Sequence, residues 1–252
     1  MKVKEIYQLI DTFAPFHTAE SYDNCGLLIG SEQATVNKIG LALDITNPII
    51  DLAIQQQIDL IVTHHPLIFH PLKQILAQTP VYRLIQHGIS HIAAHTNLDK
   101  AEQGTNTVLA ERYELTQVTT PECLENLGRM GQLQQPLPLE QYINRIKCNL
   151  GCDGIRCYDA QRPVHRVVSI SGSGAGAIKQ VLALGADTFI TGDIKHDVFV
   201  EAQNVGLNLI EVNHFDAENQ VLPALKETLE TICKAQEIEV VILSVTNQVK
   251  II

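Results

Sequence analysis

The sequence predicts an α/β protein with two related lobes, each a mostly parallel sheet covered by helices. Short runs of apolar residues alternate with amphipathic segments along most of the 252 residues, and continuously apolar strands are typical of parallel sheets that helices cover on both faces. Residues 58–99 and 186–218 also share one order of strand, helix, strand and a His-x-x-x-acid motif. We therefore expect an N-terminal α/β half over 1–116, a connecting segment over 117–164 and a C-terminal α/β half over 165–252.

The composition is that of a globular protein with its own core. Apolar residues make up 45% of the chain and charged residues 18%, and the formal net charge is −10. A chain this acidic lacks the positive field that attracts nucleic acid, and no apolar run reaches the ~18 residues of a membrane span. We therefore expect a cytoplasmic protein that binds neither nucleic acid nor membranes.

The six cysteines form no C-x-x-C pair, which fits free thiols in a reducing compartment. Cys148, Cys152 and Cys157 are close in sequence. They are either buried small residues or a site for a soft metal.

Caps and breakers define the elements of the N-terminal half. Apolar residues recur at helical spacing from Val3 to Phe13. Asn47-Pro48 and Thr79-Pro80 each combine a capping residue with a proline at the start of a helix, and Gly88 suits the end of the second helix. The predicted elements are helix 3–13, loop 15–26, strand 38–45, helix 47–57, strand 59–63, helix 79–88 and strand 90–94.

The middle of the chain is less regular, and the alternation of strands and helices resumes after Arg166. Apolar runs there again alternate with amphipathic ones. The predicted elements are strand 127–133, helix 139–150, strand 155–158, strand 167–171, helix 177–184, strand 188–191, helix 197–205, strand 207–212, helix 217–235 and strand 239–245.

Five polar residues lie at or just beyond the ends of predicted strands. The carboxyl ends of parallel strands form the ligand-binding edge of such sheets, so we expect these side chains to meet there, between the lobes. Three imidazoles and two carboxylates, without a thiolate, suit divalent Zn, Fe, Mn, Co or Ni. The candidate metal ligands are His64, His65, Asp99, His214 and Glu218.

Two metal ions fit this set better than one. Adjacent side chains of an extended strand point to opposite sides, so His64 and His65 are expected to serve different ions, with Glu218 bridging both. The spacing of His214 and Glu218 places both on one helical face. A pair of ions can clamp the attacking and leaving atoms of a hydrolysis, and its charge favours a small anionic substrate. The alternative is that these histidines only end strands and hydrogen-bond to loop carbonyls.

Further polar residues lie near the same strand ends, each with two interpretations. His95 is the candidate catalytic residue, as a proton shuttle or as a support for a ligand, and otherwise it caps a loop. The glycine-rich turn over 172–176 either closes tightly or holds phosphates on its N–H groups. Asp193, Lys195 and His196 either face the candidate site or, in the case of Asp193, cap a helix.

Four motifs together resemble the GTP cyclohydrolase 1 type 2 homologues, also called the NIF-three-like family. They are THHP at 63–66, HTNLD at 95–99, ITGD at 190–193, and His214 with Glu218. The resemblance covers nearly the whole chain and implies a two-lobed α/β fold, a dinuclear metal centre and a ring-shaped homohexamer. It also implies opening of the guanine imidazole ring of GTP, in which hydroxide attacks C8 and formate leaves.

The resemblance also implies how the ligands divide. His65, Asp99 and Glu218 hold one ion, and His64, His214 and Glu218 hold the other, while which histidine serves which ion stays open. Some members insert an extra small domain, for which the segment between the halves is too short here. Two function classes remain. One is a metal-dependent hydrolase acting on a nucleotide or related phosphorylated compound, and the other is a non-catalytic metal-handling or regulatory oligomer.

Overall fold

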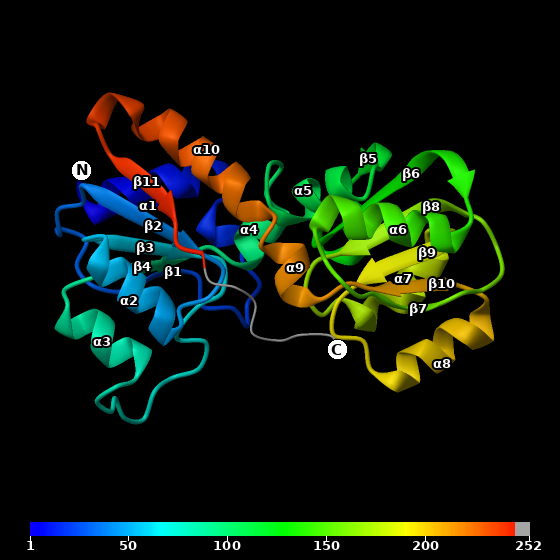
Figure 1. The fold of residues 1–252 in the computed structure, drawn as a ribbon, viewed down its shortest axis with the longest axis horizontal. Coiled ribbons are helices and arrows are strands. Elements are labelled where there is room, and N and C mark those ends of the chain that lie inside the picture. The colour runs from blue at the N-terminus through cyan, green and yellow to red at the C-terminus, as the bar shows by residue number, and fades with distance from the viewer. Residues whose placement is uncertain (245–252) are drawn as a thin grey trace. The chain divides into compact units, whose positions relative to one another are not determined.

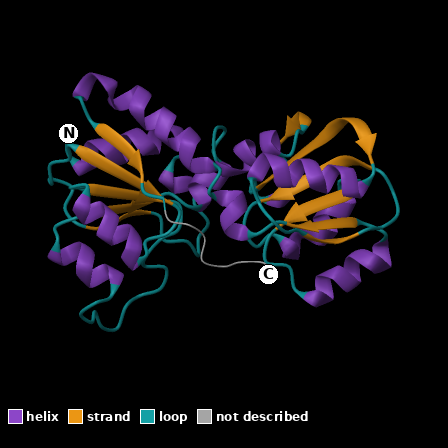
Figure 2. Ribbon diagram, viewed as in Figure 1, coloured by secondary structure: helices purple, strands orange, loops and turns teal. Residues whose placement is uncertain are grey.

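The computed structural model describes residues 1–244, and these fall into two compact units. One unit holds residues 1–104 together with the described residues from 221 onward, and the other holds 105–220. Each unit has its own sheet with helices packed on its faces (Figures 1 and 2). The predicted fold class, an α/β protein with two helix-covered sheets, is confirmed. No helix among residues 1–244 is long and apolar enough to cross a membrane.

The first unit contains a five-stranded sheet in the order β1-β4-β3-β2-β11. Strands β4, β3, β2 and β11 pair in parallel, and β1 joins β4 antiparallel. The strands are β1 (Gly26–Ile29), β2 (Lys38–Ala42), β3 (Leu60–Thr63), β4 (Ser90–Ala93) and β11 (Glu239–Ile242). The helices are α1 (Val3–Phe13), α2 (Asn47–Gln55), α3 (Pro80–Gln86), α4 (Thr96–Lys100) and α10 (Val221–Cys233).

Alternate residues of the central strand β3 pack against opposite layers of helices. Leu60 and Val62 lie in a core with residues of α1 and α10, whereas Ile61 lies in a core with residues of α2 and α3. Figure 1 shows these two layers on either face of the sheet. Because both faces are covered, the loops that follow the parallel strands are the polar edge of this unit.

The second unit contains a six-stranded sheet in the order β5-β6-β8-β9-β10-β7. The strands are β5 (Thr116–Thr119), β6 (Gly128–Leu137), β7 (Arg156–Tyr158), β8 (Val164–Ile170), β9 (Thr188–Thr191) and β10 (Asn208–Glu211). Helices α5 (Thr105–Arg112) and α6 (Leu139–Leu150) cover one face, and α7 (Ile178–Ala183) and α8 (His196–Val205) cover the other. The short helix α9 (His214–Glu218) follows β10.

The second sheet is mixed rather than mostly parallel. Strands β8, β9 and β10 form a parallel centre, but the described pairings of β5 with β6, β6 with β8, and β10 with β7 are antiparallel. The segment expected to connect the halves, residues 117–164, supplies β6, α6 and β7 to this unit.

The chain also returns to its first unit at the end. Helix α10 and strand β11 lie there, because Leu225 and Leu229 are buried in the core that α1 shares and β11 pairs with β2. The observed division therefore differs from boundaries placed at 116 and 165. The last predicted strand is present as β11 up to Ile242, and Val245 lies outside the described residues.

Candidate metal centre

His64 and His65 follow strand β3 directly, and His95 follows β4, its parallel neighbour. One ring nitrogen from each of the three histidines lies within 4.8 Å of the other two, and the ring centres of His64 and His65 are 5.1 Å apart. The adjacent histidines do not point to opposite sides as expected, because β3 ends at Thr63 and the backbone bends at residues 64 and 65. The first unit thus gathers three imidazoles at one edge of its sheet.

Hydrogen bonds fix which nitrogen of His64 and His65 carries the lone pair. Nδ1 of His64 donates to the carbonyl oxygen of Ala94 at 3.0 Å, so Nε2 is the lone-pair nitrogen of the neutral ring. Nδ1 of His65 lies 2.7 Å from Oδ1 of Asp44, which makes Nε2 the lone-pair nitrogen there as well. Histidines that bind metals are held in the same way, by a carbonyl or carboxylate on the other nitrogen. Both rings therefore keep Nε2 as the atom that could bind a metal.

Asp99 completes the polar cluster of the first unit. It lies in α4, whose first turn is closed by a hydrogen bond from Asp99 N to His95 O at 2.9 Å, and Asn97 ties this helix to Ala14 O at 2.7 Å. Oδ1 of Asp99 is 3.5 Å from Nε2 of His64, and Asp99 is only 5% exposed. When His64 is neutral, both atoms are acceptors, so a cation between them satisfies both. These residues fit a divalent ion.

His95 is held by the buried carboxylate of Asp23. Nδ1 of His95 is 2.9 Å from Oδ1 of Asp23, and Thr96 and Cys25 also donate hydrogen bonds to this carboxylate. Burial opposes ionisation of Asp23, but the hydrogen bonds, led by that from His95, outweigh it and hold its pKa well below the usual range. The ionised carboxylate fixes the ring of His95, whose centre is 5.1 and 5.5 Å from those of the other two imidazoles.

In the second unit, His214 and Glu218 lie one turn apart on α9, on one helical face as their spacing predicts. Nε2 of His214 is 2.9 Å from Oε2 of Glu218, and Glu218 is 2% exposed. Nδ1 of His214 is 2.7 Å from Oδ2 of Asp193. This ring therefore repeats the arrangement of the first unit, with Nδ1 on a supporting oxygen and Nε2 toward a buried carboxylate.

Asp193 supports His214 and is not the capping residue of α8. Helix α8 begins at His196 with Lys195 in the capping position. Asp193 adopts a left-handed backbone conformation, with φ 51°, and its side chain contacts the imidazole of His214. Of the two interpretations of Asp193, the structure supports the one that places it beside a candidate ligand.

Gly172 makes room for the pair on α9. Its φ is +58°, and a Cβ added there would lie 2.9 Å from Oε1 of Glu218 and 3.4 Å from Cε1 of His214. The N–H of Gly174 donates to Oγ1 of Thr191 at 2.8 Å, so this group is used inside the fold. The glycine-rich segment is a tight turn that packs against the candidate ligands.

Cysteine plays no part in the candidate ligand groups. Among residues 1–244, every group of three or more side chains placed to hold a metal consists of histidines and carboxylates. Cys148 and Cys157 are exposed, and Cys152 is buried. Burial raises the pKa of Cys152 and of Cys157, which disfavours the thiolate that a soft metal needs.

Asp44 and Asp23 support candidate ligands but are not among the residues that the sequence predicts for the site. Asp44 follows strand β2 by two residues, at the same end of the sheet as His64 and His65, so the strand-end argument applies to it equally. Asp23 lies in an irregular segment, and its role depends on His95, 72 residues away. No local pattern marks it.

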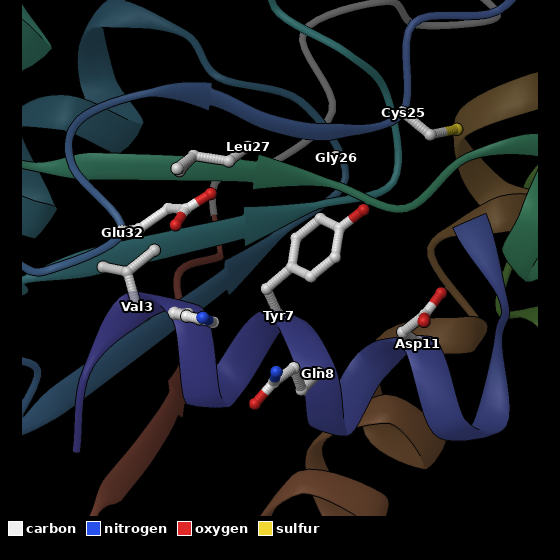
Figure 3. Close-up of a pocket in the computed structure, with 9 residues that line it drawn as sticks. Val3, Tyr7, Gln8, Asp11, Cys25, Gly26, Leu27 and Glu32 are labelled. Carbon is white, nitrogen blue, oxygen red and sulfur yellow. The ribbon is translucent and has the colours of Figure 1, made fainter. Parts of the chain in front are cut away.

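A separate cavity of about 480 Å³ lies between α1 and β1 in the first unit (Figure 3). Tyr7, Asp11, Glu32 and Cys25 are among its lining residues, and none of the five candidate ligands is. Burial and the neighbouring charge of Asp11 raise the pKa of Tyr7, so its hydroxyl stays protonated. The cavity is distinct from the histidine cluster, although the thiol of Cys25 reaches the carboxylate of Asp23.

Known proteins resemble this chain over its length. Residues 1–248 match the family model Duf34/NIF3 (NGG1p interacting factor 3). A protein named GTP cyclohydrolase 1 type 2 homolog from Clostridium perfringens is 31% identical over 240 residues, covering 91% of this chain and 92% of that protein. One of the same name from Streptococcus pneumoniae is 32% identical over 229 residues, 85% of each chain.

A solved structure gives the same picture. Staphylococcus aureus protein SA1388 superposes with a TM-score of 0.92 at 29% identity, covering 100% of this chain and 99% of that one. The resemblance inferred from the motifs is confirmed. The chain belongs to the Duf34/NIF3 family.

Proposed function

We propose that His64, His65, Asp99, His214 and Glu218 hold two divalent metal ions, with Glu218 bridging them. The single observation that carries this proposal is the shared orientation of the imidazoles. In both units the Nδ1 atom of each candidate histidine is held by a carbonyl or carboxylate, which leaves Nε2 as the lone-pair nitrogen of the neutral ring.

We further propose that the centre makes the protein a hydrolase that acts on a nucleotide or related phosphorylated compound. When bound, divalent ions lower the pKa of water towards 7 and polarise the bond to be cleaved. The relatives' name, GTP cyclohydrolase 1 type 2 homolog, points to the nucleotide. Two divalent ions outweigh the two carboxylates by two positive charges, so the acidic chain gains a local site for an anion.

The chain's own residues supply proton transfer. His95 lies beside the other imidazoles, and its Nδ1 is held by Asp23. In the proposed reaction Nε2 of His95 accepts a proton from the attacking water and returns it to the leaving group. The ionised carboxylate of Asp23 stabilises the imidazolium that forms in between.

The metal content of variants tests the centre. The wild-type protein, purified without added metal and then dialysed against one divalent ion at a time, is expected to retain about two ions per chain. Glu218→Gln is expected to lower the occupancy of both positions, whereas His214→Ala lowers one. Glu230→Gln and His87→Ala alter exposed residues outside the cluster and serve as matched controls. Unchanged metal content in Glu218→Gln contradicts a bridging role.

A substrate screen tests the chemistry. Metal-loaded protein is incubated with nucleotides and other phosphorylated compounds, and products are followed by mass spectrometry and by release of formate. Turnover that disappears in His95→Gln, while the metal content stays at the wild-type level, supports the assigned proton transfer. Turnover that survives unchanged in this variant contradicts it.

The proposal also includes the setting in which the protein works. All six cysteines are free thiols, which favours a reducing compartment such as the cytoplasm. The family resemblance favours a ring-shaped homohexamer. Sedimentation of the purified full chain tests the number of subunits.

A further inference from the structure

The loop between β3 and α3 exposes large apolar side chains immediately after the two candidate histidine ligands. It runs from residue 66 to 79 without a helix or strand. Loops of this length without secondary structure are uncommon in a compact unit and are usually either functional or linker segments. Four of its side chains are strongly exposed: Phe69 (39%), Leu72 (48%), Ile75 (49%) and Leu76 (55%).

The ring of Phe69 lies beside the histidine cluster. Its ring centre is 6.5 Å from that of His95, with the two planes at 75°, and 5.0 Å from that of His70. Phe69 therefore lies at the rim of the candidate metal centre with more than a third of its surface open to solvent.

Two consecutive residues, Asp23 and Asn24, hold His95 and the loop. Asn24 donates from Nδ2 to the carbonyl oxygen of Ile68 at 2.5 Å, next to Phe69, and Asp23 binds the ring of His95. One short segment thus holds both the backbone beside Phe69 and the ring of His95. An exposed aromatic ring that is anchored in this way is suited to stacking, because little order is lost when a ligand binds.

We propose that Phe69 is a stacking platform for the planar heteroaromatic base of the substrate. This inference rests on the proposed function, and it names the part of the substrate that the chain itself recognises. The charge of the proposed centre draws a nucleotide toward it, and the base covers the apolar ring of Phe69 beside the centre. Offset stacking removes the facing surfaces of the two rings from water, and it tolerates different bases because every base has such a face.

A tryptophan reporter tests the contact directly. The chain contains no tryptophan, so Phe69→Trp introduces a single tryptophan at the proposed platform, which can be excited apart from the tyrosines. GTP is expected to quench its fluorescence, whereas inorganic triphosphate and ribose 5-phosphate, which lack a base, leave it unchanged. Tyr82→Trp is the matched control, because Tyr82 is 40% exposed on α3. Equal quenching in both variants, or none in Phe69→Trp, overturns the inference.

Binding of GTP measured by calorimetry gives a second readout. Phe69→Ala is expected to weaken binding roughly 5- to 150-fold, the range that loss of one base–aromatic stack produces. Phe69→Tyr keeps the ring and is expected to restore the affinity. Asn24→Ala, which frees the loop, is expected to give an intermediate loss.

Metal content separates failure of this inference from failure of the proposed function. Wild-type protein that holds metal but binds GTP equally well after Phe69→Ala contradicts the stacking platform alone. Protein that binds no metal, yet shows base-dependent quenching at Phe69→Trp, contradicts the proposed metal centre and supports the platform. Absence of both contradicts both.

Discussion

Asp44 shows how one carboxylate prepares a neighbouring ring for a metal. It holds Nδ1 of His65 at 2.7 Å while remaining 47% exposed itself. We expect Asp44→Ala to lower metal affinity about 10- to 100-fold, as loss of a residue that orients a ligand usually does. Competition with a chromogenic chelator measures the affinity. Asp51→Ala removes a carboxylate that pairs with Arg83 instead and is expected to leave the affinity unchanged; equal loss in both variants contradicts this role for Asp44.

Gly172 allows a second residue-scale prediction with a close control. Gly172→Ala and Gly206→Ala both place a side chain at a left-handed φ, +58° and +64°, at a cost of about 1 kcal/mol in stability. Only at Gly172 does the new Cβ meet Glu218 and His214, since Gly206 has open space around it. Both variants are expected to unfold at similarly reduced denaturant concentrations, but only Gly172→Ala loses metal, measured by elemental analysis. Metal retained in Gly172→Ala contradicts the proposed ligand pair.

The sequence indicates candidate ligands more readily than the residues that hold them. His64 and His65 stand at the end of an apolar run, and His214 and Glu218 have helical spacing, so local patterns identify them. Asp23 acts on His95 through a contact between distant segments, which no local pattern contains. The relative orientation of the His64 and His65 rings also differs from the prediction, because a bend after β3 brings these two adjacent rings together.

Strand β4 carries a buried histidine that couples stability to pH. Burial lowers the pKa of His91 to about 3. Its Nε2 is 2.7 Å from Oγ1 of Thr63, which itself donates to the carbonyl oxygen of His65, and its Nδ1 has no hydrogen-bond partner among the described residues. Protonation would therefore place an uncompensated charge in the core of the sheet.

Because of His91, the folded protein is expected to lose stability as the pH falls. In the unfolded chain His91 becomes protonated below pH about 6.5, whereas in the folded chain it stays neutral down to pH about 3. Between these two pH values the free energy of unfolding therefore falls by up to ~1.4 kcal/mol per pH unit as the pH is lowered. Urea unfolding at several pH values between 7 and 4 measures it. His91→Gln is expected to flatten the dependence, whereas His87→Gln, at an exposed position, keeps it. Parallel slopes in wild type and His91→Gln contradict the prediction.

Elements with strong end signals were predicted well, and elements defined only by their partners were not. Thr46 and Thr79 accept hydrogen bonds from Ile49 N and Tyr82 N at the starts of α2 and α3, next to the prolines that the sequence shows. Strand β1 is missing from the predicted elements, because it has only four residues and exists through antiparallel pairing with β4. Short edge strands of this kind carry little signal of their own.

At the scale of the whole molecule, the sequence predicts two helix-covered sheets but not which segments join each one. The final strand β11 pairs with β2 near the other end of the chain, and its apolar run is equally compatible with either sheet. Loop-closure entropy grows only slowly with length, so distance along the chain does not exclude such a pairing. Long-range contacts, which no local pattern contains, therefore decide the division into two units.

The proposed homohexamer is expected to survive loss of single proposed metal ligands. Asp99 is 5% exposed, so its side chain contributes almost no surface for contact with another copy, and Asp99→Ala removes a ligand without altering an outer face. Sedimentation velocity of Asp99→Ala and His214→Ala is expected to match that of the wild-type protein, while metal content and turnover fall. Chelator-treated wild-type protein should sediment in the same way. Dissociation of the assembly in these samples would instead favour ions that serve structure, and with them the non-catalytic metal-handling or regulatory role.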